Sequence, residues 1–173
     1  MARSNERLMF MTQLSDNGPR YVEDKALTRS GLFMAGANNI LSGDTIPEGV
    51  DDGILTAQEI AQMNLRGTDL VVLSACQTGM GEISGDGVFG LQRGFKKAGV
   101  NSLLMSLWDV DDDATQMLMT SFYRNLMAGQ TKQQSLLNAQ NTVRDFSGQI
   151  NGKHRDFSNP RYWAAFILLD ALN

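Results

Sequence analysis

The sequence predicts an α/β fold, because short apolar runs typical of buried strands alternate with segments in which apolar residues recur at helical spacing. The predicted sheet contains three such runs: Leu70–Ala75, Asn101–Trp108 and Tyr162–Leu169. Helical segments separate them, and this order predicts parallel strands joined by right-handed crossovers. With 173 residues, 42% of them hydrophobic, the chain is long enough for one domain with a substantial core.

Turn and capping signals define the elements before the central strand. Ser30–Ala37 is a short apolar run that predicts a strand, and Leu8–Met11 is a second short candidate. Asn38–Asp52 contains glycine and proline and is predicted to be a surface loop. Thr56 and Glu59 have the spacing of a capping box, which starts a short helix.

Three longer helices are predicted after the central strand. The first runs from Val88 to Gly99, where glycine suits the position just after a helix end. The second opens at residues 111–113, three aspartates whose charge suits the positive end of the helix dipole. The third is capped by Thr131. The polar segment Ser147–Arg161 is predicted to be a loop.

Composition limits the classes of function. A formal net charge of −4 and an isoelectric point near 4.9 disfavour binding to nucleic acid or to an anionic membrane surface. No apolar run reaches the roughly 18 residues of a membrane span. One cysteine leaves no internal disulfide, so a cytoplasmic protein is expected. Residues 1–26 are poorly defined, and 27–173 are predicted to form the domain.

Cys76, the single cysteine, follows the predicted central strand and precedes a turn at Thr78-Gly79. In open α/β sheets, ligands bind at the carboxyl ends of the strands. A thiol there can serve as a nucleophile if a base keeps it deprotonated. Gly79 would let backbone N–H groups approach an oxyanion, with the Cys76 amide as the first donor. The competing interpretation is an inert, buried thiol.

A second group of candidate site residues follows the next predicted strand. Asp109 and Asp111 are expected at the same sheet edge as Cys76, where they could line a pocket for a basic substrate side chain. Trp108 could form one wall of that pocket. The alternative is that the acidic run caps the following helix, which accounts for Asp112 and Asp113, and that Trp108 belongs to the core.

Three further features give weaker signals. His154, the single histidine, lies in a charged stretch typical of a solvated loop, so it is a poor candidate base for Cys76. One cysteine and one histidine without short ligand spacing predict no metal site, and no cofactor is expected. Residues 85–90 match the G-x-G-x-x-G pattern of dinucleotide binding, but nine residues separate Gly85 from the strand. Nucleotide binding is therefore the least favoured of the alternative functions.

Taken together, the motifs of the chain resemble the CHAT domain, a caspase-like family of clan CD cysteine peptidases related to separase. The resemblance extends from about Arg20 to Asp170 and is carried by Leu27–Leu32, Ala35–Asn38, Asp52–Ala57, Asp69–Gly81, Gly87–Arg93, Ser106–Trp108, Val110–Asp112, Phe122–Tyr123 and Tyr162–Phe166. It implies a mostly parallel central sheet flanked by helices. It also implies an endopeptidase in which a Cys–His dyad attacks a peptide carbonyl, with Cys76 at the nucleophile position of the S-A-C-x-T-G motif.

The chain departs from the family at the catalytic histidine. In the family this residue belongs to a His-Gly pair upstream of the segment that begins at Ser30, whereas no histidine precedes His154 here. We therefore expect the leading strands of the sheet to be missing from this chain, and the isolated chain to be inactive. The alternative function is a pseudo-peptidase that serves as a binding or scaffold module.

The resemblance and the expected loss of strands also predict partners. A polypeptide substrate is implied by the family, in which helical repeats such as tetratricopeptide units often precede the domain. A parallel sheet without its leading strands would expose an edge. We therefore expect the chain to associate with itself through that edge.

Overall fold

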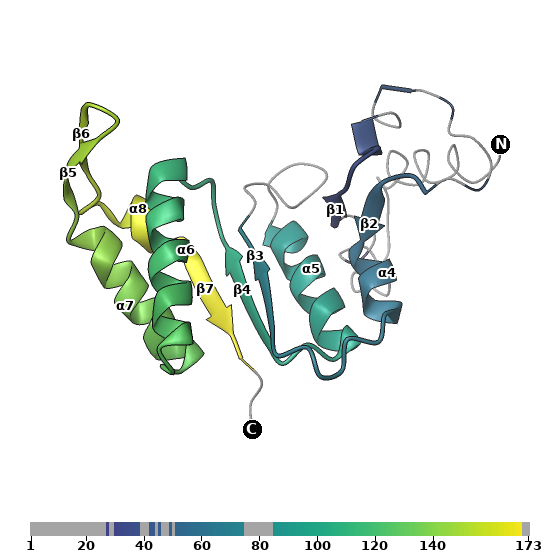
Figure 1. Ribbon diagram of the computed structural model, residues 1–173. Coiled ribbons are helices and arrows are strands. Elements are labelled where there is room, and N and C mark those ends of the chain that lie inside the picture. The colour runs from purple at the N-terminus through teal and green to yellow at the C-terminus, as the bar shows by residue number, and fades with distance from the viewer. Residues whose placement is uncertain are drawn as a thin grey trace. The chain divides into compact units, whose positions relative to one another are not determined.

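The computed structural model describes residues 30–38, 51–74 and 85–170, together with residues 27, 42, 43, 45 and 49. The chain forms two compact units, one from residues 1–68 and 78–100 and the other from residues 69–77 and 101–173. Helices and strands occur in both units, which confirms the α/β class (Figure 1). The predicted strand Leu8–Met11, most of the predicted loop at 38–52 and the proposed boundary at residue 27 depend on residues outside the described part.

The first unit contains a small antiparallel sheet and two helices. Strand β1 (Gly31–Phe33) pairs with β2 (Ile54–Thr56), and helices α4 (Ala57–Gln62) and α5 (Gly85–Ala98) follow. The capping box at the start of α4 is confirmed. The Thr56 hydroxyl oxygen accepts from the Glu59 N–H at 3.2 Å, and the Glu59 carboxylate accepts from the Thr56 N–H at 2.9 Å.

Helices α4 and α5 pack closely because α5 has a glycine at their contact. A Cβ atom built on Gly94 would lie 2.6 Å from the carbonyl oxygen of Ala57. On either side of this contact, Ile60 and Leu91 are fully buried. Helix α5 ends at Ala98, and the φ of 99° at Gly99 confirms the predicted glycine after the helix end.

The second unit is built on the sheet that was expected to position the site. Its strands are β3 (Leu70–Leu73), β4 (Ser102–Ser106) and β7 (Phe166–Leu169), with β4 in the middle. Strands β3 and β4 are parallel, as predicted, whereas β7 runs antiparallel to β4. The prediction of parallel pairing was therefore wrong for the last strand.

The direction of β7 follows from the two helices that precede it. Helix α6 (Asp112–Met127) leads away from the carboxyl end of β4, and α7 (Lys132–Arg144) packs against α6 and returns the chain to that end (Figure 1). A single crossover helix would have delivered a parallel strand. Because two helices intervene, β7 starts where β4 ends and runs back beside it.

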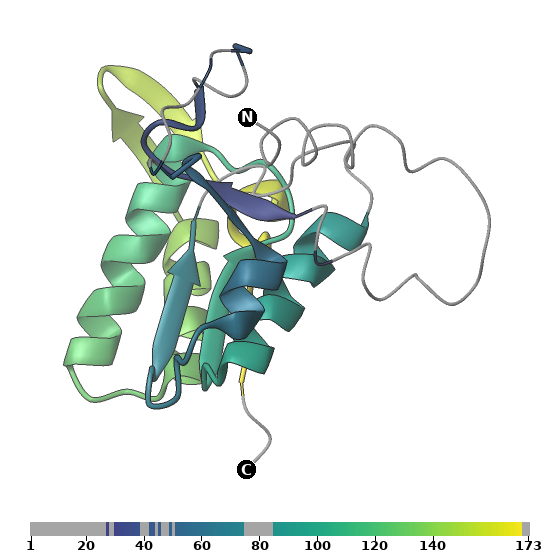
Figure 2. The ribbon, with the colours of Figure 1, turned by 90° about the vertical axis from the view of Figure 1, so that its right-hand side faces the viewer.

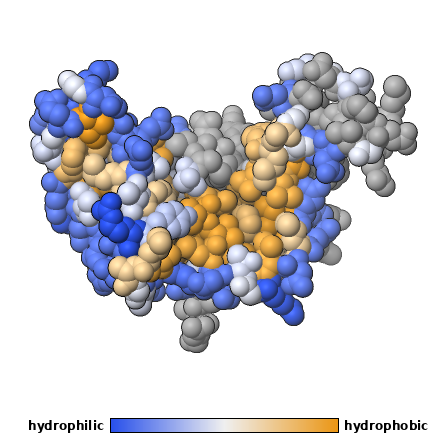
Figure 3. Space-filling view, in the orientation of Figure 1, coloured by the Kyte–Doolittle hydropathy of each residue, from blue (hydrophilic) through white to orange (hydrophobic). Residues whose placement is uncertain are grey.

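Helices α6 and α7 cover one face of this sheet. The core contains fully buried residues from two strands and both helices: Leu104 of β4, Leu118 and Phe122 of α6, Ala139 and Val143 of α7, and Phe166 of β7. All five residues of β4 are buried, whereas the four apolar residues of β3 are only partly buried. Figure 3 shows apolar surface in the region that β3 occupies.

The segment predicted as the polar loop Ser147–Arg161 is instead structured. Strands β5 (Ser147–Ile150) and β6 (Lys153–Asp156) form an antiparallel hairpin, and a short helix, α8 (Pro160–Trp163), follows. The hairpin turns at Asn151-Gly152, where both residues have positive φ angles of 50° and 75°. This dipeptide is the preferred sequence for a two-residue turn between strands.

Within the described residues, no helix has the length and apolar character needed to cross a membrane.

Replacing Gly94 by alanine is expected to destabilise the first unit. In an exposed helix this change is favourable, but here the new methyl group would be 2.6 Å from the Ala57 carbonyl oxygen. We expect a loss of about 1–3 kcal/mol in the free energy of unfolding, the usual cost of overpacking. Urea denaturation measures it, with the exposed Lys97→Ala of the same helix as the control. Increased stability of Gly94→Ala would contradict the packing described.

Candidate functional site

The candidate site lies in the second unit, in the loop Leu107–Asp111 that follows β4. Two hydrogen bonds hold the start of this loop: the Leu107 N–H donates to the carbonyl oxygen of Ala165 at 2.9 Å, and the Trp108 indole N–H donates to that of Arg161 at 3.0 Å. Trp108 is 43% exposed. The core interpretation of Trp108 was therefore wrong, and its ring is available at the surface.

Asp109, directly after Trp108, is exposed. Within the part of the chain that the structure describes, no hydrogen bond or ion pair to its side chain is present. Trp108 and Asp109 together present an aromatic ring and a carboxylate to solvent at the carboxyl end of β4. These are the groups that a basic side chain prefers, through cation–π and charge–charge interactions.

Asp111 has a different environment, because it caps α6. One carboxylate oxygen accepts a hydrogen bond from the Ala114 N–H at 3.1 Å, and the other pairs with the Arg155 guanidinium. Partial burial raises the pKa of Asp111, but the hydrogen bonds from Arg155 and Ala114 outweigh this effect and hold the pKa below its usual value of 3.8. Asp111 is therefore a charged cap, already partnered by an arginine.

Arg155 on β6 joins the hairpin to the start of α6. Besides Asp111, its guanidinium lies 3.4 Å from a carboxylate oxygen of Asp113, in the first turn of α6. The guanidinium also lies 5.3 Å from the centroid of the Phe157 ring, which is almost fully buried. Arg155 was not among the predicted site residues, because the segment that contains it was predicted to be a loop. The Asn151-Gly152 turn was the signal that could have revealed the hairpin.

The predicted nucleophile, Cys76, and the turn residue Gly79 lie outside the described residues. The described part gives the strand that leads to them. Leu73, the last residue of β3, is opposite Met105 of the parallel strand β4, and Cys76 follows three residues later. Strand β3 therefore ends at the same end of the sheet as β4, the strand that the loop with Trp108 follows. The roles of Cys76 and Gly79 remain predictions.

His154, the single histidine, lies on the exposed hairpin. It faces Gln149 across the β5–β6 ladder, and its side chain is exposed, as the sequence predicted. Figures 1 and 2 both place the hairpin at the end of the unit toward which β3 points, and Figure 1 places α6 between the hairpin and β3. This arrangement gives no support to His154 as the base for the thiol that follows β3.

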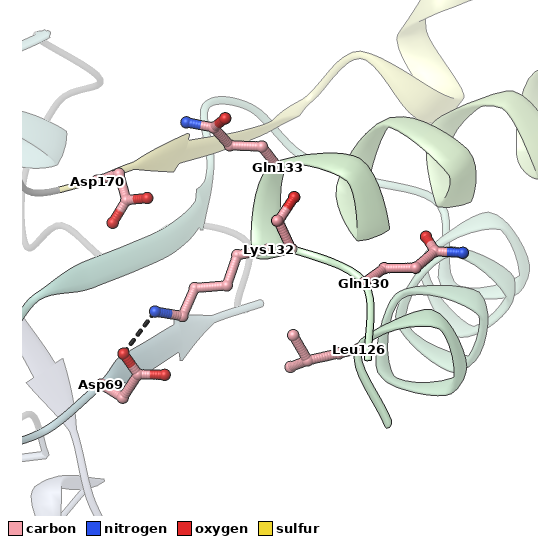
Figure 4. A pocket seen from close by; sticks show the side chains of 7 residues that line it. Asp69, Leu126, Gln130, Lys132, Gln133 and Asp170 are labelled. Carbon is pink, nitrogen blue, oxygen red and sulfur yellow. Dashed lines mark hydrogen bonds and ion pairs between the residues drawn. The ribbon is translucent and has the colours of Figure 1, made fainter. Parts of the chain in front are cut away.

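A shallow pocket of about 430 Å³ lies at the opposite end of the second unit, near the start of β3 (Figure 4). Its lining is largely polar: Asp69, Leu126, Gln130, Thr131, Lys132, Gln133 and Asp170. The Lys132 ammonium is 2.5 Å from the Asp69 carboxylate, so the charge of this lysine is already neutralised. The pocket is distant from the carboxyl ends of β3 and β4, and we do not assign chemistry to it.

The structure gives no support to nucleotide binding or to a metal site in the described residues. Residues 85–90, which match the dinucleotide pattern, all lie within α5. In a dinucleotide site the first glycine instead makes the tight turn between a strand and the helix. Among the described residues, no group of three or more His, Cys, Asp or Glu side chains is arranged to hold a metal ion.

Comparison with known proteins agrees with the resemblance. The model of the CHAT domain matches residues 15–171, almost the whole chain. The chain belongs to the CHAT domain family. The α/β architecture described above is consistent with the caspase-like fold that this family implies.

Two relatives are the tetratricopeptide repeat protein 28 of Mus musculus and that of Homo sapiens. They are 34% and 33% identical to the chain over 116 residues, which is 67% of the chain. The chain corresponds to only 4% of the length of each relative. No solved structure matches the chain.

Replacing Asp111 by asparagine should lower stability in a pH-dependent way. Asparagine still caps the helix, but it removes the charge that favours the N-terminus of α6, so we expect a loss of about 0.5–1 kcal/mol at pH 7. A carboxyl group whose pKa is lower in the folded chain stabilises above its unfolded pKa, and this contribution is lost as the pH falls through the folded value. The difference between wild type and variant should therefore shrink below the usual pKa of 3.8.

Urea denaturation at pH 7 and at successively lower pH values measures this difference. Asp112→Asn is the matched control, because Asp112 is an exposed aspartate of the same helical turn. It should have the smaller effect at pH 7. A difference between wild type and Asp111→Asn that stays constant down to low pH would contradict the charged cap.

Proposed function

We propose that this chain is the part of a CHAT-family cysteine endopeptidase that carries the nucleophile and binds the polypeptide. Cys76 would attack the peptide carbonyl, and its own N–H, together with the turn at Gly79, would stabilise the oxyanion. The family match over residues 15–171 is the observation that carries the proposal. The parallel pairing of β3 and β4 supports it, because the strand that precedes Cys76 in the sequence and the strand that precedes Trp108 end at the same end of the sheet.

The residue before the scissile bond is proposed to be basic. Trp108 and Asp109 are exposed beside each other at this end of the sheet, and a guanidinium could stack on the indole while it pairs with the carboxylate. Asp111 was predicted to share this role. Since Asp111 already pairs with Arg155, we propose Asp109 as the main carboxylate and Asp111 as a secondary one.

The 173-residue chain is proposed to be inactive by itself. A cysteine without a base to deprotonate it is mostly a neutral thiol at pH 7, and loss of a general base typically costs about 10²–10⁴ in rate. His154 is the single histidine, and it lies on the exposed hairpin beyond α6. The same observation favours the second candidate function, a pseudo-peptidase that binds polypeptides without cleaving them.

The domain is further proposed to work beside tetratricopeptide repeats. Both named relatives are tetratricopeptide repeat proteins, and the matched segment is a small fraction of their length. Repeat arrays present extended concave surfaces that suit the binding of polypeptides. They could therefore deliver a polypeptide to the site after β4.

Alkylation of Cys76 by peptide chloromethyl ketones tests the nucleophile and the basic preference together. The sulfur displaces chloride from the probe carbon, so a carbon–sulfur bond forms and chloride leaves. We expect a probe that ends in arginine to react about tenfold faster than one that ends in glutamate, as about 1.4 kcal/mol of binding would give. Because the chain has one cysteine, mass spectrometry should show one addition.

Variants separate the parts of this proposal. Cys76→Ala should abolish the addition, and Asp109→Asn should remove the preference for arginine. Asp145→Asn, which removes the same charge at the end of α7, should leave it unchanged. Equal rates with both probes would contradict the binding role of Trp108 and Asp109. Cys76-dependent cleavage of arginine-containing peptides by the chain alone would contradict the proposed inactivity.

Self-association through the edge of β3 is the last part of the proposal. In the described residues, β3 pairs only with β4, and its residues Leu70, Val71, Val72 and Leu73 are partly exposed. An apolar strand edge readily pairs with another chain, and a charge on such an edge opposes this pairing.

Val71→Lys is therefore expected to shift the chain toward the monomer in multi-angle light scattering, whereas the wild type should associate as its concentration rises. Met127→Lys is the matched control, because Met127 is 88% exposed near the end of α6. A wild type that stays monomeric at all concentrations would contradict the proposal. An equal effect of Met127→Lys would place the association elsewhere.

A further inference from the structure

Arg155 pairs with some of the aspartates that follow β4 and not with others. Its guanidinium pairs with Asp111 and lies 3.4 Å from a carboxylate oxygen of Asp113. Asp109 has no such partner among the described residues. The three aspartates therefore differ in availability, although they are close in sequence and carry the same charge.

The contacts of Arg155 are those of a binding site for a guanidinium. Two carboxylates lie near one of its terminal nitrogen atoms, and the Phe157 ring lies 5.3 Å from its central carbon. Phe157 is held in turn by Phe146, at a ring distance of 5.4 Å, and by Tyr162, at 5.1 Å. An arginine bound between carboxylates and an aromatic ring is the arrangement expected for recognition of a basic side chain.

The hairpin brings this arginine to the site from a distant part of the sequence. Arg155 lies on β6, 44 residues from Asp111, and the surface of the hairpin is mostly hydrophilic (Figure 3). Within the described residues, its Nε atom is buried without a hydrogen-bond partner. Arg155 is therefore held mainly by its ion pairs and by its contact with the Phe157 ring, and one of its hydrogen-bond donors is unused.

We propose that Arg155 is a specificity-determining residue of the polypeptide site, because it occupies a second position that would otherwise accept a basic side chain. This inference rests on the function proposed above. With Arg155 in place, the site takes one basic residue, at Trp108 and Asp109. Without Arg155, Asp111 and Asp113 become available, and the site takes two basic residues from the same peptide.

Binding of fluorescent peptides to the 173-residue chain tests this proposal. The peptides contain one arginine, two adjacent arginines, two arginines separated by one residue, or glutamate in place of arginine. We expect the wild type to bind the single-arginine and two-arginine peptides within about threefold of each other. Arg155→Met should bind at least one two-arginine peptide about tenfold more tightly than the wild type does, a change of about 1.4 kcal/mol.

Three further variants make the result specific. Arg155→Met combined with Asp111→Asn should lose the gain, because the freed carboxylate is gone. Arg155→Lys should behave like the wild type, since the positive charge remains. Arg144→Met is the matched control, because Arg144 pairs with Asp145 on the exposed surface and its loss changes the net charge equally. A gain with Arg144→Met would reveal a general charge effect and overturn the proposal.

The remaining outcomes are distinguishable. If wild type and Arg155→Met bind the two-arginine peptides equally, while the single-arginine peptide is still preferred over the glutamate peptide, the inference fails and the proposed function stands. If the wild type shows no preference for arginine over glutamate, the proposed binding role of Trp108 and Asp109 fails, and the inference fails with it. Should Arg155→Met not fold, as judged by circular dichroism, Arg155→Gln carries the same test, because it retains a donor without the positive charge.

Discussion

The second unit depends on the burial of β4. This strand pairs on both sides, parallel with β3 and antiparallel with β7, and all five of its residues are buried. At its start, the Ser102 hydroxyl donates to the Asp170 carboxylate at 2.5 Å. At its end, Leu107 is hydrogen-bonded to the segment before β7. A strand held on both edges and at both ends fixes where the following loop begins, and this loop carries the residues proposed for recognition.

Local chemistry was enough to predict most elements of the fold. The Thr56–Glu59 capping box, the cap at Thr131 and the glycine at 99 all depend on groups within a few residues of one another, so the sequence contains the whole interaction. The direction of β7 was not predictable in this way. It depends on how α6 and α7 pack, and this packing involves residues far apart in the chain.

The site was predictable to a similar extent. The sequence placed acidic residues after β4, and the structure confirms that this run opens α6. The pairing of Asp111 with Arg155 was missed, because nothing near Asp111 in the sequence indicates a partner 44 residues away. The sequence left open whether Trp108 lies at the surface or in the core. A tryptophan at the end of an apolar run is usually buried, but here one hydrogen bond satisfies its N–H while the ring remains at the surface.

The reversal of β7 places its first and last residues at opposite ends of the sheet. Leu169 lies opposite Leu103 near the start of β4, whereas Phe166 lies opposite Ser106 at its end. Strand β7 therefore ends at the end of the sheet opposite the exposed Trp108. A fluorescent protein or an affinity tag fused after β7 would be attached at that end, away from the surface that carries Trp108.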